Sequence, residues 1–130
     1  MLCLAEDGAQ GDADRLAQLA AVLAVGSRAV WPSGARPLWE QLPHAARERV
    51  SLAQDWRAEA VHFDAVLHHG AADELLELQH TLAQRPGPII GVTSLAPGAT
   101  NVPLERLLIE RSLSINTAAA GGNASLMTIG

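Results

Sequence analysis

Short apolar runs alternate with longer amphipathic segments over the first three quarters of the chain. Each apolar run is bounded by turn-forming residues such as Gly, Pro and Asp, which is typical of short buried strands. These runs cover residues 2–5, 28–31, 50–53, 63–68 and 89–93. Between them, Leu and Val recur every three or four residues over 12–26 and 72–84, a spacing that predicts helices with one apolar face. Strands alternating with helices favour a parallel sheet covered on both faces. The pattern therefore predicts an α/β fold with a doubly wound, mostly parallel, five-stranded sheet.

The ends and links of these elements are less regular. Asp12 is the expected N-cap of the first helix and Gly26 its C-terminal stop. A broken helix is expected over 38–49, because Pro43 interrupts it. Only about ten residues separate the third and fourth runs, which is short for a parallel crossover. Either this link is a single helical turn, or the third run is not a strand.

The last third of the chain has a different pattern. Apolar and polar residues alternate over 107–116, which predicts a strand with one polar face. A helix over 104–110 is the competing interpretation. Small, turn-prone residues follow over 117–125. We therefore expect a sheet domain over residues 1–95 and a C-terminal extension over residues 96–130.

Composition and charge exclude several classes of protein. The 130 residues include one Cys, no Lys and a net charge of −5. A single Cys excludes a disulfide scaffold and a Cys-based zinc site. Without a basic excess, no nucleic-acid partner is expected. No apolar run approaches the length of a membrane span, and the sequence does not start with a signal-peptide pattern. A cytoplasmic location is the resulting expectation.

A dinucleotide site is also disfavoured by charge. A Rossmann site needs a glycine-rich turn after the first strand, so that backbone N–H groups can meet a pyrophosphate. The turn Gly8–Gly11 lacks the full glycine spacing, and four carboxylates flank it. Asp73 and Glu74 already lie where the later helix would begin, as capping anions. We predict no cofactor-binding residue here.

Metal binding and nucleophilic catalysis are disfavoured as well. His62 and His68 are about 20 Å apart along an extended strand, so they, Asp64 and His69 are not expected to share an ion. Cys3 lies inside an apolar run, where a thiol behaves as a small buried apolar group. We therefore predict no metal ligand and no catalytic residue.

Several segments resemble the C-terminal end of the long bacterial proline utilization A proteins. The most specific is the tail, residues 105–130, and the resemblance also covers residues 2–8, 19–31 and 86–90. The resemblance implies a piece of a bifunctional flavoenzyme that oxidises proline with FAD and glutamate semialdehyde with NAD. The start of the sequence then indicates an excised fragment with Met1 as its initiator.

In that family, the additional C-terminal domain is similar to the NAD-binding fold of aldehyde dehydrogenases. This sequence has Trp31 where the dehydrogenases have a Lys that contacts the cofactor ribose, and residues 69–71 replace their Thr-Gly-Ser loop. The motifs with the catalytic Cys and Glu have no counterpart. The resemblance thus implies a degenerate Rossmann domain without cofactor or chemistry, in a parent that holds FAD and NAD.

The resemblance also implies a structural role. The domain would pack beside the aldehyde dehydrogenase module, and its tail, over residues 110–127, would cover the tunnel that channels the intermediate. The implied contact residues are Glu110, Arg111, Asn116, Thr117, Gly121, Gly122, Asn123, Ser125 and Met127. In isolation, the tail would be disordered or would self-associate as a strand. The parent would be cytoplasmic or peripheral to the inner membrane. A stand-alone nucleotide-binding domain and a dimerisation domain are the alternatives.

Overall fold

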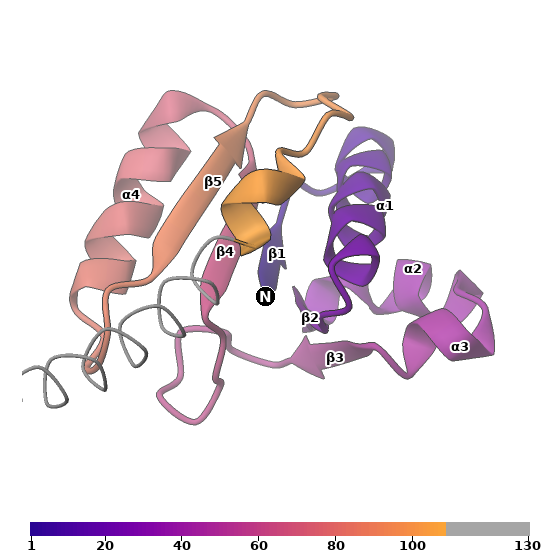
Figure 1. Cartoon of the computed structure of the whole chain (residues 1–130), viewed down its shortest axis with the longest axis horizontal. Helices are drawn as coiled ribbons and strands as arrows, with labels where there is room; N and C mark the ends of the chain where they lie inside the picture. Colours follow the sequence, from indigo (N-terminus) through magenta and orange to yellow (C-terminus); the bar gives the residue numbers. More distant parts are fainter. Residues whose placement is uncertain (109–130) are drawn as a thin grey trace, which may run out of the picture.

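Five parallel strands form one sheet in the order β3-β2-β1-β4-β5 (Figure 1). This computed structural model describes residues 1–108. The strands are β1 (Leu2–Leu4), β2 (Ala29–Pro32), β3 (Val50–Ala53), β4 (Ala65–His69) and β5 (Gly91–Leu95). Each predicted run overlaps one strand, so the predicted five-stranded α/β sheet is confirmed, and every pairing is parallel.

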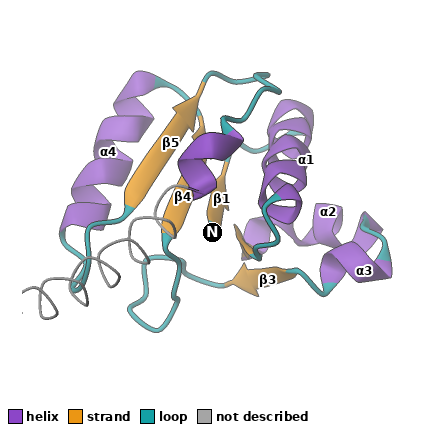
Figure 2. Cartoon of the chain, in the orientation of Figure 1, coloured by secondary structure: helices purple, strands orange, loops and turns teal. Residues whose placement is uncertain are grey.

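Helices cover both faces of the sheet, as the doubly wound fold requires (Figure 2). They are α1 (Ala9–Ala24), the 3-10 helix η1 (Ser33–Ala35), α2 (Arg36–Gln41), α3 (His44–Arg47) and α4 (Ala72–Ala83). Pro43 separates α2 from α3, as the sequence indicated.

The predicted start of the first helix is wrong. The N-cap of α1 is Gly8, with a φ of 102° that a residue with a side chain rarely adopts. Asp12 lies in the first turn of the helix, where a carboxylate interacts favourably with the helix dipole. At the other end, Gly26 has a φ of 71° and follows the last turn, which is the expected glycine stop.

Two apolar cores lie on opposite faces of the sheet. The α1-face core joins α1 and α2 to the sheet, and its buried residues include Leu19, Val22, Trp31, Leu38, Leu67 and Val102. The α4-face core joins α4 and the loop over residues 54–64 to the sheet, and its buried residues are Leu2, Ala53, Trp56, Phe63, Val66, Leu78 and Leu82. The sheet is therefore buried on both sides.

The short link between the third and fourth strands is a loop. Val50–Ala53 is a strand, so the doubt about the third run is resolved, and the chain over residues 54–64 contains turns but no helix. Trp56 and Phe63 cover the α4 face of the sheet from this loop, with their ring centroids 6.4 Å apart. Two aromatic side chains thus cover the sheet where a longer crossover would place a helix.

After β5 the chain returns to the α1 face. Residues 104–108 are helical and lie between β5 and α1 (Figure 1). Val102 is buried in the α1-face core, and Leu107 packs against it. The predicted strand is therefore wrong at Leu107 and Leu108, where the competing helix is found. The rest of that predicted strand lies outside the described residues, and the boundary at residue 95 stays a prediction.

Within residues 1–108, no helix is long and apolar enough to cross a membrane.

Candidate functional site at the carboxyl edge of the sheet

The topology identifies one edge of the sheet where a ligand is expected. The strand order reverses between β1 and β4, which are neighbours. In open α/β sheets, ligands bind in the crevice beyond the carboxyl ends of the strands at such a switch point. The residues that surround this crevice come from the end of β1, the first turns of α1, the end of β4 and the loop after β5.

Gly11 allows α1 to start close to the end of β1. A Cβ atom at this position would overlap the carbonyl oxygen of Glu6, so only glycine fits without a shift of the helix. Together with the positive φ of Gly8, this close approach gives the turn two of the features that glycines provide in a dinucleotide-binding turn.

The charges near this turn are unfavourable for a phosphate. Arg15 is the one basic residue of α1, and it is only 4% exposed. Its guanidinium donates to the carbonyl oxygen of Ala5 at 2.8 Å and lies 3.5 Å from carboxylate oxygens of Asp7 and Asp12. The charge of Arg15 is thus already paired with groups of the protein. Glu6 adds a further exposed carboxylate.

Gln18 and His69 form a buried hydrogen-bond chain at the end of β4. Both residues are 0% exposed. The Gln18 amide nitrogen donates to the carbonyl oxygens of Leu4 and Leu67, at 2.8 and 3.3 Å, and lies 2.9 Å from His69 Nδ1. The opposite amide orientation would place Oε1 against those two carbonyl oxygens. His69 Nε2 lies 2.7 Å from the carbonyl oxygen of Ala99, which can only accept, so Nε2 carries the proton and Nδ1 does not. The Gln18 amide nitrogen has two hydrogens for the three acceptors around it.

That proton is donated to the loop after β5. His69 Nε2 lies 2.7 Å from the carbonyl oxygen of Ala99, and the backbone N–H of Gly98 donates to Asp14 Oδ1 at 2.9 Å. Asp14 is only 4% exposed and also accepts from the Gln10 amide at 3.1 Å. We name Asp14, Gln18 and His69 the carboxyl-edge clamp. The clamp holds a segment of the chain itself on the α1 side of the crevice.

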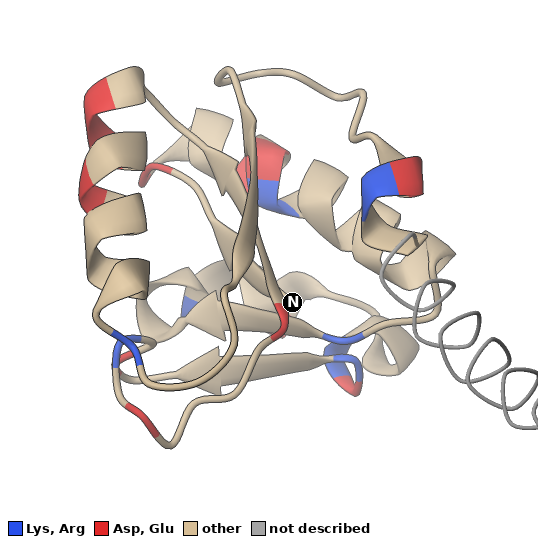
Figure 3. Ribbon diagram, turned by 60° about the vertical axis from the view of Figure 1, so that its left-hand side comes forward, with Lys and Arg blue, Asp and Glu red and all other residues tan. Residues whose placement is uncertain are grey.

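On the α4 side of the same edge lies a pocket of about 300 Å³, lined in part by Glu6, Arg57, His68 and Glu74. Burial lowers the pKa of His68, although Glu74, 3.9 Å away, acts in the opposite direction. Glu74 Oε2 accepts from the backbone N–H of Ala71 at 3.1 Å. The predicted acidic cap of α4 is thus confirmed, and Figure 3 shows the acidic residues in the first half of this helix.

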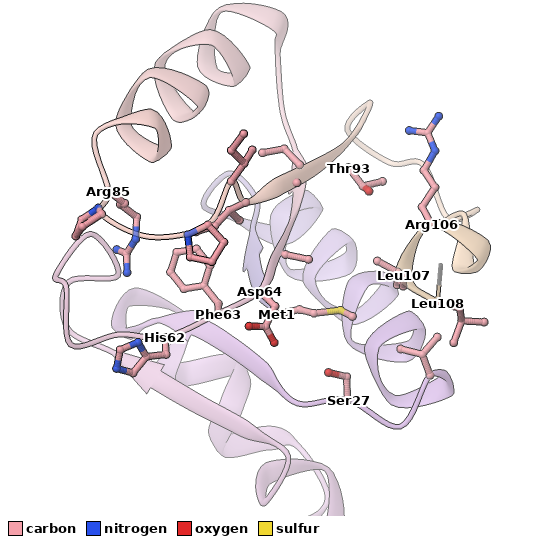
Figure 4. A pocket seen from close by; sticks show the side chains of 18 residues that line it. Met1, Ser27, His62, Phe63, Asp64, Arg85, Thr93, Arg106, Leu107 and Leu108 are labelled. Atoms are coloured by element: carbon pink, nitrogen blue, oxygen red, sulfur yellow. The ribbon is translucent and has the colours of Figure 1, made fainter. Parts of the chain in front are cut away.

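The opposite, amino edge of the sheet has a larger pocket of about 940 Å³ (Figure 4). Its lining is mostly apolar and includes Phe63 and Leu107, with Arg85 and Arg106 among its few charged residues. Arg85 also donates to backbone carbonyl oxygens of the loop over residues 54–64.

The structure separates the histidines considered as metal ligands. His62 and Asp64 line the amino-edge pocket, whereas His68 and His69 line the pocket at the carboxyl edge. Within residues 1–108, no group of three or more His, Cys, Asp or Glu side chains is placed to hold a metal ion.

Cys3 is a buried structural residue. It is 0% exposed within the α1-face core, and burial raises the pKa of its thiol to about 12. This confirms the expectation that its thiolate is disfavoured. Trp31 is also 0% exposed in that core, so its side chain does not reach the crevice in which a cofactor-binding residue would act.

The contact residues implied by the resemblance are not among the described ones. Residues outside the description are Glu110, Arg111, Asn116, Thr117, Gly121, Gly122, Asn123, Ser125 and Met127. The three residues of the carboxyl-edge clamp, in contrast, were not predicted from the sequence. Its available signal was a pair of polar residues four apart, Asp14 and Gln18, next to the apolar positions of the first helix.

No protein-family model matches the chain. Its sequence is 54% identical over 132 residues to the Bifunctional protein PutA of Escherichia coli (strain K12), which covers 100% of this chain and 10% of that relative. The identity is 53% over 132 residues to the protein of the same name from Salmonella typhimurium, and 41% over 120 residues to that from Rhizobium meliloti. The chain is therefore homologous to a segment of PutA, and it spans about a tenth of the length of these relatives.

Proposed function

We propose that this chain is a non-catalytic structural domain of a bifunctional enzyme that oxidises proline to glutamate. In this proposal, the domain supports the aldehyde dehydrogenase module and covers the tunnel that channels the intermediate. Homology to a segment of a bifunctional protein supports the assignment to such a parent. FAD and NAD would belong to the parent's catalytic modules, and the parent would be cytoplasmic.

The observation that carries the structural role is that the chain itself occupies the α1 side of the crevice. The fold is one that commonly binds a dinucleotide, but Asp14 and His69 hold the backbone of residues 98–99 at this edge. Exposed carboxylates of Glu6 and Asp7 lie at the same end of β1. A pyrophosphate there would meet negative charge and would have to displace buried hydrogen bonds. A structural role for the domain requires neither the binding of an anion beside these carboxylates nor the loss of these hydrogen bonds.

Deletion of residues 110–130 from the full-length parent tests this role. The measurement is the lag before NADH appears when proline is supplied, together with the two separate activities on supplied substrates. We expect a longer lag, because the intermediate would escape from an uncovered tunnel. A tail of the same length and composition in scrambled order is the control for chain length. A normal lag with intact aldehyde dehydrogenase activity would disprove the tunnel role.

Nucleotide binding is the second candidate function. The positive φ of Gly8 and the close approach at Gly11 favour it, because glycines have these roles in dinucleotide-binding turns. Titration of the chain with NAD and with ATP separates the two candidates, since micromolar binding would favour the second.

A further inference from the structure

The loop after β5 is held to the sheet domain through its backbone. Residues 96–99 form a turn in which the N–H of Ala99 donates to the carbonyl oxygen of Ala96 at 3.0 Å. Gly98 has a φ of 82°, a conformation that glycine adopts without strain. This turn presents one N–H and one carbonyl oxygen to the clamp, and both are bound.

Buried side chains bind both groups. The three clamp residues are 0–4% exposed in a region that joins α1, β1 and β4. The carboxylate of Asp14 makes a charge-assisted hydrogen bond to Gly98, which is among the stronger kinds. His69 is oriented by its bond to the carbonyl oxygen of Ala99, and its Nδ1 lies 2.9 Å from the buried Gln18 amide nitrogen. The loop thus binds a rigid, pre-organised surface.

The consequence for the following segment is geometric. Only a few residues separate Ala99 from the helix over residues 104–108, and Val102 enters the α1-face core between them. The helix lies between β5 and α1, and Leu108, the last described residue, lines the amino-edge pocket (Figure 4). The clamp at one edge of the sheet therefore determines where the chain reaches the opposite edge.

We propose that Asp14, Gln18 and His69 are positioning residues that fix the point from which the C-terminal segment, residues 109–130, leaves the domain. This inference rests on the proposed function, in which that segment acts on a partner module. A tail that covers a tunnel must start from a fixed place. Each flexible residue between the domain and the tail would widen the range of positions that the tail could take. The clamp removes that freedom at residues 98–99.

The test combines amide exchange with the coupled assay. In the 130-residue chain, Asp14→Ala and His69→Leu each remove one bond to the loop. We expect the Gly98 amide in Asp14→Ala to exchange about tenfold faster or more, because a partly buried hydrogen bond to a carboxylate is lost. In the full-length parent, both variants should lengthen the lag towards that of the tail deletion, with both separate activities retained.

Conservative and control variants separate positioning from general destabilisation. Asp14→Asn keeps an oxygen acceptor and His69→Gln keeps a nitrogen donor, so both should restore most of the normal lag. Leu82→Ala opens a cavity in the α4-face core without touching the clamp, and its lag should stay normal. If a clamp variant does not fold, Gly98→Ala strains only the loop, since Gly98 is exposed and has a positive φ.

The outcomes distinguish the two proposals. Fast exchange at Gly98 with a normal lag would overturn the positioning role, even if deletion of the tail lengthens the lag. A normal lag in the deletion variant would overturn the tunnel role and the positioning role together. A longer lag in Leu82→Ala would also count against positioning, because destabilisation alone would then produce the effect.

Discussion

Gly11 shows how one missing side chain sets the distance between a helix and a strand. A Cβ atom there would overlap the Glu6 carbonyl oxygen, which belongs to the backbone and cannot rotate away. We expect Gly11→Ala to lower the free energy of unfolding by about 1–3 kcal/mol, as overpacking does, in urea denaturation. Gly34→Ala is the matched control, because nothing lies within 4 Å of its added Cβ. Equal effects at both positions would contradict this explanation.

Cys3 provides a second prediction at the residue scale. Its thiol is fully buried with a pKa of about 12, so almost no thiolate exists at pH 8. We expect a disulfide reagent such as Ellman's reagent to modify Cys3 only when the chain unfolds. A thiol introduced at exposed Gln84 should react at once in the folded chain. Equally fast reaction of Cys3 in the folded chain would show that it is accessible.

Single residues differ in how far the sequence predicts them. The burial of Cys3 followed from its apolar neighbours, which are local. Asp12 was mistaken for a cap because an acidic residue is favourable both at the cap and in the first turn of a helix. The bond between Asp14 and Gly98 joins residues 84 positions apart. No periodicity within a single element reports a contact of that kind.

At the scale of elements, Arg85 organises the loop that connects β3 to β4. Its guanidinium donates to the carbonyl oxygens of Trp56, Arg57, Ala58 and Val61 and lies 4.7 Å from the centre of the Phe63 ring. Lysine cannot reproduce this fork of donors. We expect Arg85→Lys to lower the free energy of unfolding by about 1–3 kcal/mol, in urea denaturation, and to speed proteolysis within residues 54–64.

Arg57→Lys is the control for the Arg85 prediction. Arg57 lies 4.6 Å from the centre of the Trp56 ring in the same loop, but it is exposed. Its replacement should change the free energy of unfolding by about 0.5 kcal/mol or less. Similar losses from both replacements would mean that the loop does not depend on the donors of Arg85.

The elements themselves were largely predictable, because buried parallel strands are short apolar runs between helix and turn signals. The helix over residues 104–108 was ambiguous, since Leu104, Leu107 and Leu108 satisfy helical spacing while Leu107 also starts an alternating pattern. The helix forms where Leu107 can pack against the α1-face core. That tertiary contact selects the helix over the strand that the alternating pattern favoured.

At the scale of the whole molecule, His68 makes stability depend on pH. Burial lowers its pKa in the folded chain, whereas the unfolded value is about 6.5. Between these two values the unfolded chain binds more protons, so the free energy of unfolding falls as the pH drops below about 6.5. Below the pKa of His68 in the folded chain, both states are protonated, and His68 no longer changes the free energy of unfolding. Urea denaturation at a series of pH values measures the effect.

His68→Gln should reduce this acid dependence, because glutamine does not titrate. His80→Gln is the control, since His80 is exposed near the end of α4. An unchanged pH profile in His68→Gln would assign the acid sensitivity to other groups.

Residues 1–108 combine a topology common in nucleotide-binding domains with a crevice whose α1 side is occupied by the chain's own backbone. The topology was predictable from the order of strands and helices, but the occupation of the crevice was not. It depends on β5 and the turn after it returning to α1, as the bonds of Gly98 and Ala99 show. These bonds, rather than the fold class, support the proposed structural role.

Calorimetric titration of the 130-residue chain with NAD tests the central claim most directly. An occupied crevice with exposed carboxylates should give no saturable heat at NAD concentrations up to about 1 mM, which corresponds to a binding free energy weaker than about −4 kcal/mol. A dissociation constant in the micromolar range would contradict the claim, because it would show that the crevice opens and holds a dinucleotide.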